Sequence, residues 1–287
     1  MLRRVAALAV VVLVPGFLAP AAVTPAVGAG PRPVTLLATN FQSVPTGPMS
    51  PQSFAKTLKG SASSQDLDDS SVVAAAGNKS YRIALRRGGV GTRYGMVDVI
   101  PLRRQVNQAC VRFRVRFDGS FDWSLGGKLP GLSGVAPGVS PSLPAGGGNP
   151  GAKGWSGRMM WRTKTSLPSS HARRANPSMP VSYMYGPHQV SKYGDVVPWG
   201  LSFKAGKWHT VRQCYVMNAV GKRNGILRAW LDGRRVLNIT NYVYRTRSDV
   251  RISHLMWSVF RGGDTREWAG SRDNHIQFDN VRVWTRA

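Results

Sequence analysis

Apolar and polar residues alternate with a period of two along much of the chain, a pattern typical of β-strands whose two faces meet different surroundings. The clearest example is the segment 109–117, in which alanine, valine and phenylalanine alternate with Arg112, Arg114 and Arg116. The apolar set predicts a core face and the arginine set a basic outer face. After residue 29, no stretch shows the sustained i, i+3, i+4, i+7 spacing of an amphipathic helix.

Further short strands are predicted between segments that contain Gly and Pro. Asn224 with Gly225, and Asp232 with Gly233, are the dipeptides that type I′ hairpin turns prefer, so 208–239 is predicted to form a meander. The predicted strands are 81–86, 109–117, 155–161, 181–185, 208–217, 226–231, 235–239, 252–260 and 276–284. This pattern predicts an all-β fold, a jelly-roll sandwich of antiparallel sheets, as a single domain at 30–287.

Two segments carry a weaker strand signal. Residues 30–75 are expected to hold only short edge strands. The segment 131–154 is so rich in Gly, Pro and Ser that it is predicted to be one long loop. Loops of this length within a domain are often lids or binding loops.

The first 29 residues have the pattern of an export signal. Two arginines at positions 3 and 4 precede an apolar run at 5–18, and small residues continue to Ala29. This order predicts a secretory signal peptide at 1–29. The alternative, a membrane anchor, is disfavoured because two prolines interrupt a run shorter than the ~20 residues of a membrane span. No transmembrane segment is therefore expected after cleavage.

Cys110 and Cys214 are the only cysteines, and both lie in predicted strands. In an oxidising compartment they are candidates for a disulfide between neighbouring strands. Such a bridge would stabilise the fold by about 4 kcal/mol on the chain-entropy argument. Two buried free thiols are the alternative.

The charge balance restricts the chemistry. Lysine and arginine total 39 against 13 acidic residues, giving a net charge of +26. Anionic partners are expected. Glu267 is the only glutamate, which disfavours glycoside hydrolysis by a pair of glutamates. Nucleotide-binding and nucleophile-elbow motifs are missing and the five histidines are scattered, so no cofactor and no metal is expected.

Basic, hydroxyl and aromatic residues recur at two-residue spacing between 126 and 193. On a strand, residues two apart share a face, so Ser156 points with Arg158, and Tyr183 with Tyr185. If the two strands are neighbours and Lys128 arrives from the preceding loop, these side chains form a cleft for an acidic sugar. Each has an ordinary alternative: a turn lysine, a solvated sheet face, or tyrosines that only pack across strands.

This residue set suits β-elimination on a uronate polymer. The reaction must neutralise the carboxylate, remove the neighbouring carbon-5 proton and protonate the leaving oxygen. Arginine and lysine supply the first function. A tyrosine beside them supplies the others if its pKa falls toward the working range.

The ordered motifs GGKLPGL, SGRMMWR, YMYGP, FRGGDTREWAG and FDNVRVW resemble polysaccharide lyase family 14, whose members include alginate and glucuronate-polymer lyases on a β-jelly roll. The resemblance implies that Lys128 and Arg158 bind or neutralise the carboxylate and that Ser156 helps to hold the sugar. It also implies that Tyr183 and Tyr185 include the proton-transfer groups, with Tyr185 as the expected base or acid.

Four further residues are candidates for substrate binding. Arg162 lies in the SGRMMWR motif, and Gln189 follows the tyrosines. His188 is either a general base or a surface histidine. Trp268 either stacks on a sugar or packs in a structural turn.

Three functions follow from the sequence. The first is a secreted lyase that cleaves alginate, polymannuronate or glucuronan without a metal. The second is a carbohydrate-binding jelly roll that has no turnover. The third is a cationic protein that binds polyanions through charge alone. We expect an acidic polysaccharide as partner, no specific nucleic acid, and a monomer.

Overall fold

The computed structural model describes residues 32–58, 70–167 and 178–286. Residues Pro33–Ala287 form one compact unit. The predicted signal peptide at 1–29 lies outside the described residues.

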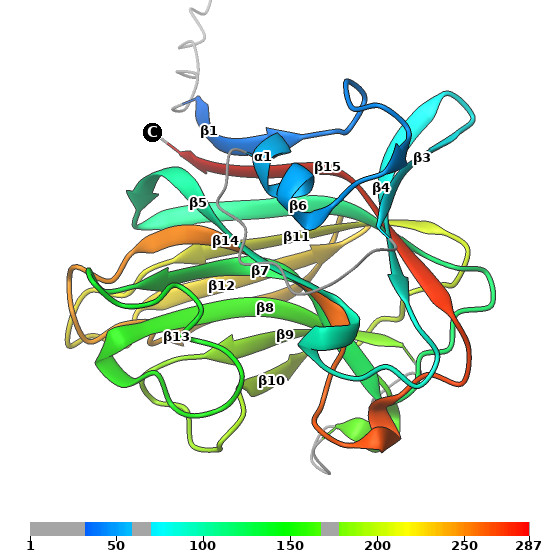
Figure 1. The fold of residues 1–287 in the computed structure, drawn as a ribbon. Coiled ribbons are helices and arrows are strands. Elements are labelled where there is room, and N and C mark those ends of the chain that lie inside the picture. The colour runs from blue at the N-terminus through cyan, green and yellow to red at the C-terminus, as the bar shows by residue number, and fades with distance from the viewer. Residues whose placement is uncertain (1–31, 59–69, 168–177, 287) are drawn as a thin grey trace, which may run out of the picture. The chain divides into compact units, whose positions relative to one another are not determined.

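Two antiparallel sheets pack face to face in this unit, as predicted for a jelly roll (Figure 1). The larger sheet has nine strands in the order β13-β12-β11-β6-β15-β4-β3-β2, and β1 also pairs with β15. These strands are β1 (Pro33–Thr39), β2 (Gly47–Pro48), β3 (Ser71–Ala75), β4 (Asn78–Leu85), β6 (Gln108–Phe117), β11 (Trp208–Val216), β12 (Gly225–Leu231), β13 (Arg234–Tyr242) and β15 (Asn274–Arg286).

The smaller sheet has six strands in the order β10-β9-β8-β7-β14-β5. These are β5 (Met96–Val106), β7 (Gly126–Val135), β8 (Gly154–Arg162), β9 (Met179–Tyr185), β10 (Asp195–Pro198) and β14 (Ile252–Arg261). The helical elements are α1 (Pro51–Thr57) and the 3-10 turns η1 (Thr92–Tyr94), η2 (Gly151–Lys153), η3 (Lys164–Ser166) and η4 (Arg266–Trp268).

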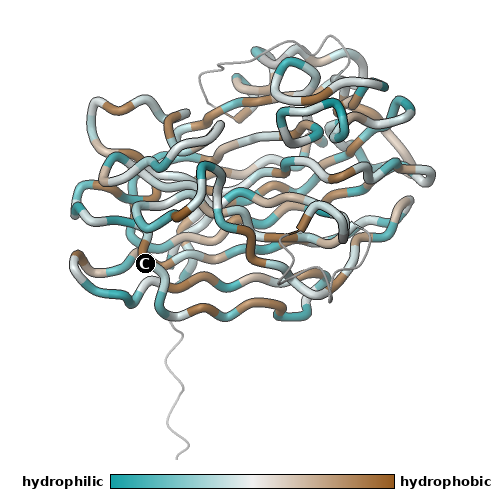
Figure 2. Tube along the Cα trace, turned by 90° about the horizontal axis from the view of Figure 1, so that it is seen from below, coloured by the Kyte–Doolittle hydropathy of each residue, from teal (hydrophilic) through white to brown (hydrophobic). Residues whose placement is uncertain are grey.

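The core lies between the two sheets. Val111, Phe113 and Val115 of β6 are fully buried, as their alternation with arginine predicted. Each such side chain contributes roughly 1.5–3 kcal/mol through burial. Figure 2 shows the same alternation of hydrophobic and hydrophilic positions along the strands. Phe117 of β6 meets Trp161 of β8 with ring centroids 5.7 Å apart, so the two sheets pack directly on each other.

One of the two predicted hairpin turns is confirmed and the other is wrong. Asp232 and Gly233 both have positive φ, 51° and 84°, and join β12 to β13 in the predicted tight turn. Asn224 instead ends a longer connection after β11, where its Oδ1 accepts a hydrogen bond from the backbone N–H of Ala219 at 3.0 Å. Gly225 is already the first residue of β12.

The prediction of a loop over the whole of 131–154 is also wrong, because 131–135 complete β7. The glycine there reflects close packing between strands. A Cβ on Gly131 would lie 2.0 Å from the carbonyl oxygen of Gly157 on β8.

The helix α1 was not predicted. It has seven residues, too few to display a helical period. Ser50 caps it by accepting a hydrogen bond from the backbone N–H of Ser53 at 3.2 Å. Phe54 anchors it in the core, with its ring centroid 4.9 Å from that of Trp257.

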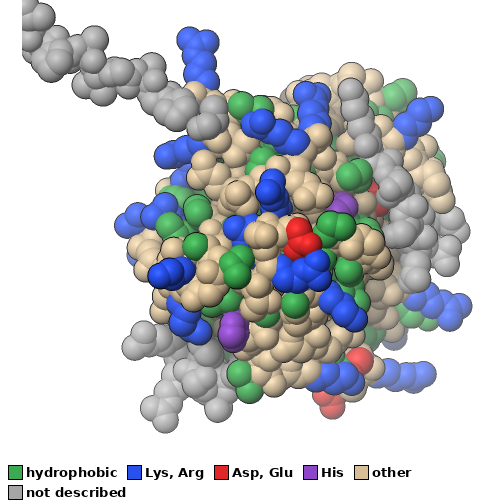
Figure 3. All heavy atoms as spheres, turned by 90° about the vertical axis from the view of Figure 1, so that its left-hand side faces the viewer, with side chains coloured by type: hydrophobic (Ala, Val, Ile, Leu, Met, Phe, Trp, Pro, Cys, Tyr) green, Lys and Arg blue, Asp and Glu red, His purple; other side chains and the backbone are tan. Residues whose placement is uncertain are grey.

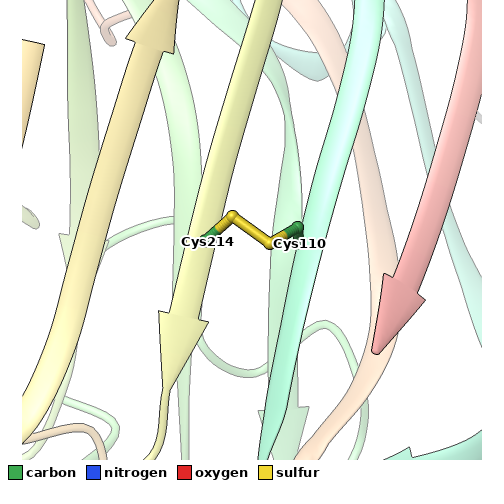
Figure 4. Close-up of a disulfide and its surroundings, with 2 residues drawn as sticks. All are labelled: Cys110 and Cys214. Atoms are coloured by element: carbon green, nitrogen blue, oxygen red, sulfur yellow. A yellow bond between two sulfur atoms is a disulfide. The ribbon is translucent and has the colours of Figure 1, made fainter. Parts of the chain in front are cut away.

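Cys110 and Cys214 form a disulfide, the pairing expected from the sequence (Figure 4). They lie directly opposite each other on β6 and β11, which are neighbouring strands. The bridge joins positions 104 residues apart in the sequence and therefore constrains a long loop in the unfolded chain.

Candidate active site

A cavity of about 1000 Å³ lies on the face of the six-stranded sheet that is turned away from the core. Its floor is made by side chains of β5, β7, β8, β9 and β14, and its walls by the connections after β4, β7, β8, β9 and β14. The size suits a ligand of several sugar rings. Of the nine catalytic and substrate-binding residues predicted from the sequence, six line it: Lys128, Arg158, Arg162, Tyr183, Tyr185 and Trp268.

Strand pairing brings the arginine and the two tyrosines together. Arg158 of β8 lies directly opposite Tyr183 of β9, so both point into the cavity. The hydroxyl groups of Tyr183 and Tyr185 are 3.2 Å apart. The guanidinium carbon of Arg158 lies 5.7 Å from one ring centre and 5.6 Å from the other. Three hydrogen-bond donors therefore converge on one part of the cavity.

Lys128 was expected to arrive from a loop, but it lies within β7. The pairing of β7 with β8 shifts by one residue between Leu129 and Leu132, around Pro130, so that both leucines face the core. Because its backbone neighbour Leu129 faces the core, Lys128 faces the cavity. Its Nζ lies 3.6 Å from the ring centre of Tyr183 and 3.0 Å from the Sδ of Met160.

Burial places Lys128 in surroundings that disfavour its charged form. Its side chain is 8% exposed. Loss of water, followed by the positive charges of Arg158 and Arg162, holds the pKa of Lys128 well below its ordinary value. Among the described residues, Lys128 has no carboxylate partner within ion-pair distance. The neutral amine is therefore favoured, and a neutral amine can accept a proton.

The pKa of Tyr183, the tyrosine that contacts Lys128, shifts in the direction opposite to the one expected from the sequence. Burial first, and then Tyr185, raise the pKa of Tyr183 above its ordinary value. The expectation of a lowered tyrosine pKa was wrong for Tyr183, because desolvation outweighs the attraction of Arg158. The phenol of Tyr183 stays protonated and serves as a hydrogen-bond donor.

Arg158 is a buried cation with unused donors. It is 3% exposed, and its Nε and Nη2 have no hydrogen-bond partner among the described residues. Its Nη1 donates only a long hydrogen bond, 3.5 Å, to the Oγ of Ser258. A buried guanidinium group with unpaired N–H donors lowers the stability of the fold unless a hydrogen-bond acceptor binds to those donors. The planar pair of donors matches a carboxylate.

Arg162 and Trp268 form one wall of the cavity. The guanidinium carbon of Arg162 lies 4.9 Å from the indole centre of Trp268, and its Nε donates to Ser166 Oγ at 3.0 Å. Burial lowers the pKa of Arg162 to about 10. The wall therefore combines a cation with an aromatic surface for a sugar ring.

A bridge crosses the mouth of the cavity. The Tyr193 hydroxyl donates to Asp264 Oδ2 at 2.5 Å, and both residues line the cavity. Tyr193 lies in the connection that follows β9. This strand ends at Tyr185, which lies opposite Ser156 at one end of the sheet. Asp264 follows β14 at the opposite end, so the contact spans the cavity along the strands.

Three predicted residues, Ser156, His188 and Gln189, do not line the cavity. Ser156 has the predicted side-chain direction, but the loop after β7 covers it and its Oγ donates to the carbonyl of Pro144. His188 is exposed. Gln189 ties two loops together, since its Nε2 donates to the carbonyl oxygens of Gly148 and Ser191 at 3.2 and 2.7 Å.

Sequence reasoning missed Met160 and Ser258, and it included Tyr193 only as the end of the basic, hydroxyl and aromatic run at 126–193, with no role. Met160 lies two residues after Arg158 and therefore shares its face of the strand. The spacing could have identified it, but an apolar side chain did not suggest a role in binding or catalysis. The contacts of Ser258 and Tyr193 depend on which strands and loops meet in space. Among the described residues, no group of three His, Cys, Asp or Glu side chains is arranged to hold a metal ion.

The fold is similar to that of solved polysaccharide lyases. The alginate lyase Aly36B is 24% identical, with a TM-score of 0.69 over 89% of this chain and 97% of its own. The alginate lyase from Aplysia kurodai is 22% identical, with a TM-score of 0.74 over 87% and 98%. The endo-β-1,4-glucuronan lyase from Trichoderma reesei is 12% identical, with a TM-score of 0.51 over 88% and 96%.

A comparison with curated protein sequences finds no significant match. The family model of polysaccharide lyase 14, in contrast, matches residues 65–281. This match covers most of the domain, including both strands that carry the arginine and the tyrosines. The chain therefore belongs to polysaccharide lyase family 14, and it is a polysaccharide lyase.

Proposed function

We propose that this lyase cleaves a uronate polymer by β-elimination without a metal, with the neutral amine of Lys128 as the base. The observation that carries the proposal is the buried cluster of Lys128, Arg158 and Tyr183, in which burial lowers the pKa of the amine beside a guanidinium with unused donors. Among the described residues, the only acid that lines the cavity is Asp264, at its mouth. A uronate carboxylate is the anion that this cluster lacks.

Arg158 and the two tyrosine hydroxyls bind the carboxylate of the sugar whose bond is cleaved. Their hydrogen bonds draw negative charge toward the carboxylate oxygens and make the carbon-5 hydrogen more acidic. They become stronger as the enolate-like intermediate forms, because that intermediate carries more negative charge on the same oxygens. The phenol of Tyr183 remains protonated and can therefore donate throughout.

Lys128 transfers the proton. Its amine takes the carbon-5 proton, the electron pair forms the double bond between carbons 4 and 5, and the bond from carbon 4 to the glycosidic oxygen breaks. The ammonium then returns the proton to the leaving oxygen, so charge and protons balance. This assignment differs from the tyrosine acid and base expected from the sequence, because the pKa of Tyr183 is raised and that of Lys128 is lowered.

The use of one group for both transfers favours certain substrates. A single amine can remove and return the proton only where the carbon-5 hydrogen and the leaving oxygen lie on the same face of the ring. Mannuronate and glucuronate have this arrangement, whereas guluronate has the two on opposite faces. We therefore propose polymannuronate or glucuronan as the substrate. The similarity to alginate lyases and to a glucuronan lyase supports this choice.

The test is the ultraviolet absorbance of the unsaturated uronate product, measured with purified protein on polymannuronate, polyguluronate and glucuronan separately. The proposal predicts a rise on polymannuronate or glucuronan and a much smaller one on polyguluronate. No rise on any of the three, with polymer binding retained, would identify a binding module instead. A rise on polyguluronate alone would contradict the single-group mechanism.

We also propose that the chain is secreted after removal of residues 1–29 and acts as a monomer. The basis is the order of basic, apolar and small residues at the N-terminus. Within the described part of the chain, no helix is long and apolar enough to span a membrane. Mass spectrometry of the N-terminus of exported protein and light scattering test the two statements. An N-terminus that retains the first 29 residues, or a dimer, would contradict them.

A further inference from the structure

The outer face of the nine-stranded sheet carries arginine and tryptophan side chains that the proposed reaction does not use. We define the arginine–tryptophan face by six residues: Arg112, Arg212, Arg282, Trp208, Trp230 and Trp284. All are partly exposed or exposed. Strand pairing places them on one face, opposite the buried side chains of β6 that form the core. The core and the second sheet separate this face from the active-site cavity.

Three arginines form a row across three neighbouring strands. Arg112 of β6 lies directly opposite Arg212 of β11 on one side and Arg282 of β15 on the other. Neighbouring strands are about 4.8 Å apart, so like charges stand close together. Directly opposed like charges destabilise a sheet. Burial first, and then the charge of Arg112, lower the pKa of Arg212, which shows the same strain.

Acidic residues do not offset this row. Among the described residues, Arg112, Arg212 and Arg282 form no ion pair. Asp279 lies on the same sheet face, but it is fully buried and lies 3.7 Å from Arg114 instead. Figure 3 shows one side of the molecule, where Lys and Arg side chains far outnumber acidic ones. The row therefore has the charge complementarity for an extended polyanion.

Tryptophans accompany the arginines. The guanidinium carbons of Arg212 and Arg282 lie 3.7 and 5.6 Å from the indole centres of Trp230 and Trp284. That of Arg114 lies 4.9 Å from Trp208. Aromatic side chains offer flat surfaces to sugar rings, and the fixed guanidinium groups beside them offer paired donors to carboxylates. This combination matches a polymer whose every ring carries a carboxylate.

We propose that the arginine–tryptophan face is a second, non-catalytic binding site for the uronate polymer. The proposal rests on the proposed function for the choice of polymer. Binding here neutralises the arginine row and holds a long chain to the protein while another part of it occupies the cavity. Because the two sites share no residues, their contributions can be separated by mutation.

The test compares two double variants in a Lys128→Ala background, in which the polymer is not cleaved. Arg112→Gln with Arg212→Gln removes the centre of the row. Lys222→Gln with Arg223→Gln removes the same charge from an exposed loop. Calorimetry with long polymannuronate is expected to show a dissociation constant at least tenfold higher for the first pair, the effect of losing one charge-assisted hydrogen bond. For the second pair we expect less than a threefold change.

Two further measurements keep the result unambiguous. With Lys128 intact, Arg112→Gln with Arg212→Gln is expected to leave kcat/KM on a trisaccharide unchanged, so a loss there would show that the substitutions disturb the cavity. The midpoint temperature of thermal unfolding should not fall, because the substitutions remove the repulsion between the two arginines. Equal loss of polymer binding in both pairs would overturn the proposal, as would weakened binding of duplex DNA with unchanged binding of polymannuronate.

Failure of the wild-type enzyme to cleave any uronate polymer would refute the proposed function. The comparison of polymer binding between the two double variants would still test the proposed second site.

Discussion

Replacing Lys128 with methionine is expected to increase the free energy of unfolding near neutral pH, by an amount that shrinks as the pH rises. Methionine has a similar volume and no charge. In the native protein Lys128 is 8% exposed, and the hydrogen bond of its amine goes to a thioether, a weak acceptor. Methionine at this position removes that desolvation cost.

The size of the pH effect follows from proton linkage. In the unfolded chain the lysine keeps its ordinary pKa, about 10.4, whereas in the folded chain burial and two arginines lower it. Between these two values the unfolded state binds one more proton, so the stability of the native protein rises by about 1.4 kcal/mol per pH unit. The Lys128→Met protein lacks this contribution. The difference between the two proteins should therefore fall at that slope and disappear near pH 10.4.

Urea unfolding of both proteins at several pH values between 6 and 9 measures this difference. Contributions from other titrating groups cancel, because both proteins contain them. A difference that stays constant with pH would refute the reasoning, since it would mean that Lys128 carries the same charge in the folded and unfolded states. A native protein more stable than Lys128→Met at pH 6 would refute it as well.

Three other substitutions test separate parts of the account. Arg158→Lys is expected to lower kcat/KM on the substrate polymer by about 10²–10³, because an ammonium cannot reproduce paired planar donors; initial rates that stay within threefold of wild type would contradict this. Asp264→Ala is expected to raise kcat/KM on long polymer relative to a trisaccharide, since it opens the bridge to Tyr193, and an unchanged ratio would show that the bridge does not limit access. Cys214→Ser should lower the free energy of unfolding by about 2–4 kcal/mol in urea while activity at 25 °C is retained, and an undiminished stability would contradict a structural role for the disulfide.

The strands were predictable where successive residues alternate between the buried core and the solvent. In 109–117 the arginines and the apolar residues occupy opposite faces of β6, and the pattern alone assigns both. The same rule placed Tyr183 and Tyr185 on one face and Arg158 with Ser156 on another strand's face, and the pairing of β8 with β9 brings the two sets together. It did not place α1, because a helix of seven residues is fixed by its cap and by the burial of Phe54 rather than by a period.

The remaining features depend on contacts between distant segments. Leu129 and Leu132 both face the core because the register shifts between them, around Pro130, and this interrupts the period-two pattern that would have identified β7 and the direction of Lys128. Ser156 points as predicted but lies beneath a loop whose path is set elsewhere. The pKa of Tyr183 follows from its burial among several strands, so the charged neighbours in the sequence suggested the wrong direction.

The role of Lys128 as the base is tested most directly by kcat/KM of Lys128→Ala on the polymer that the wild-type enzyme cleaves, with Lys153→Ala as the matched control. Lys153 is exposed and does not line the cavity. The account predicts a loss of about 10²–10⁴ for Lys128→Ala, the contribution of a general base, and no loss for Lys153→Ala. A folded Lys128→Ala protein that retains more than a tenth of the wild-type kcat/KM would contradict it.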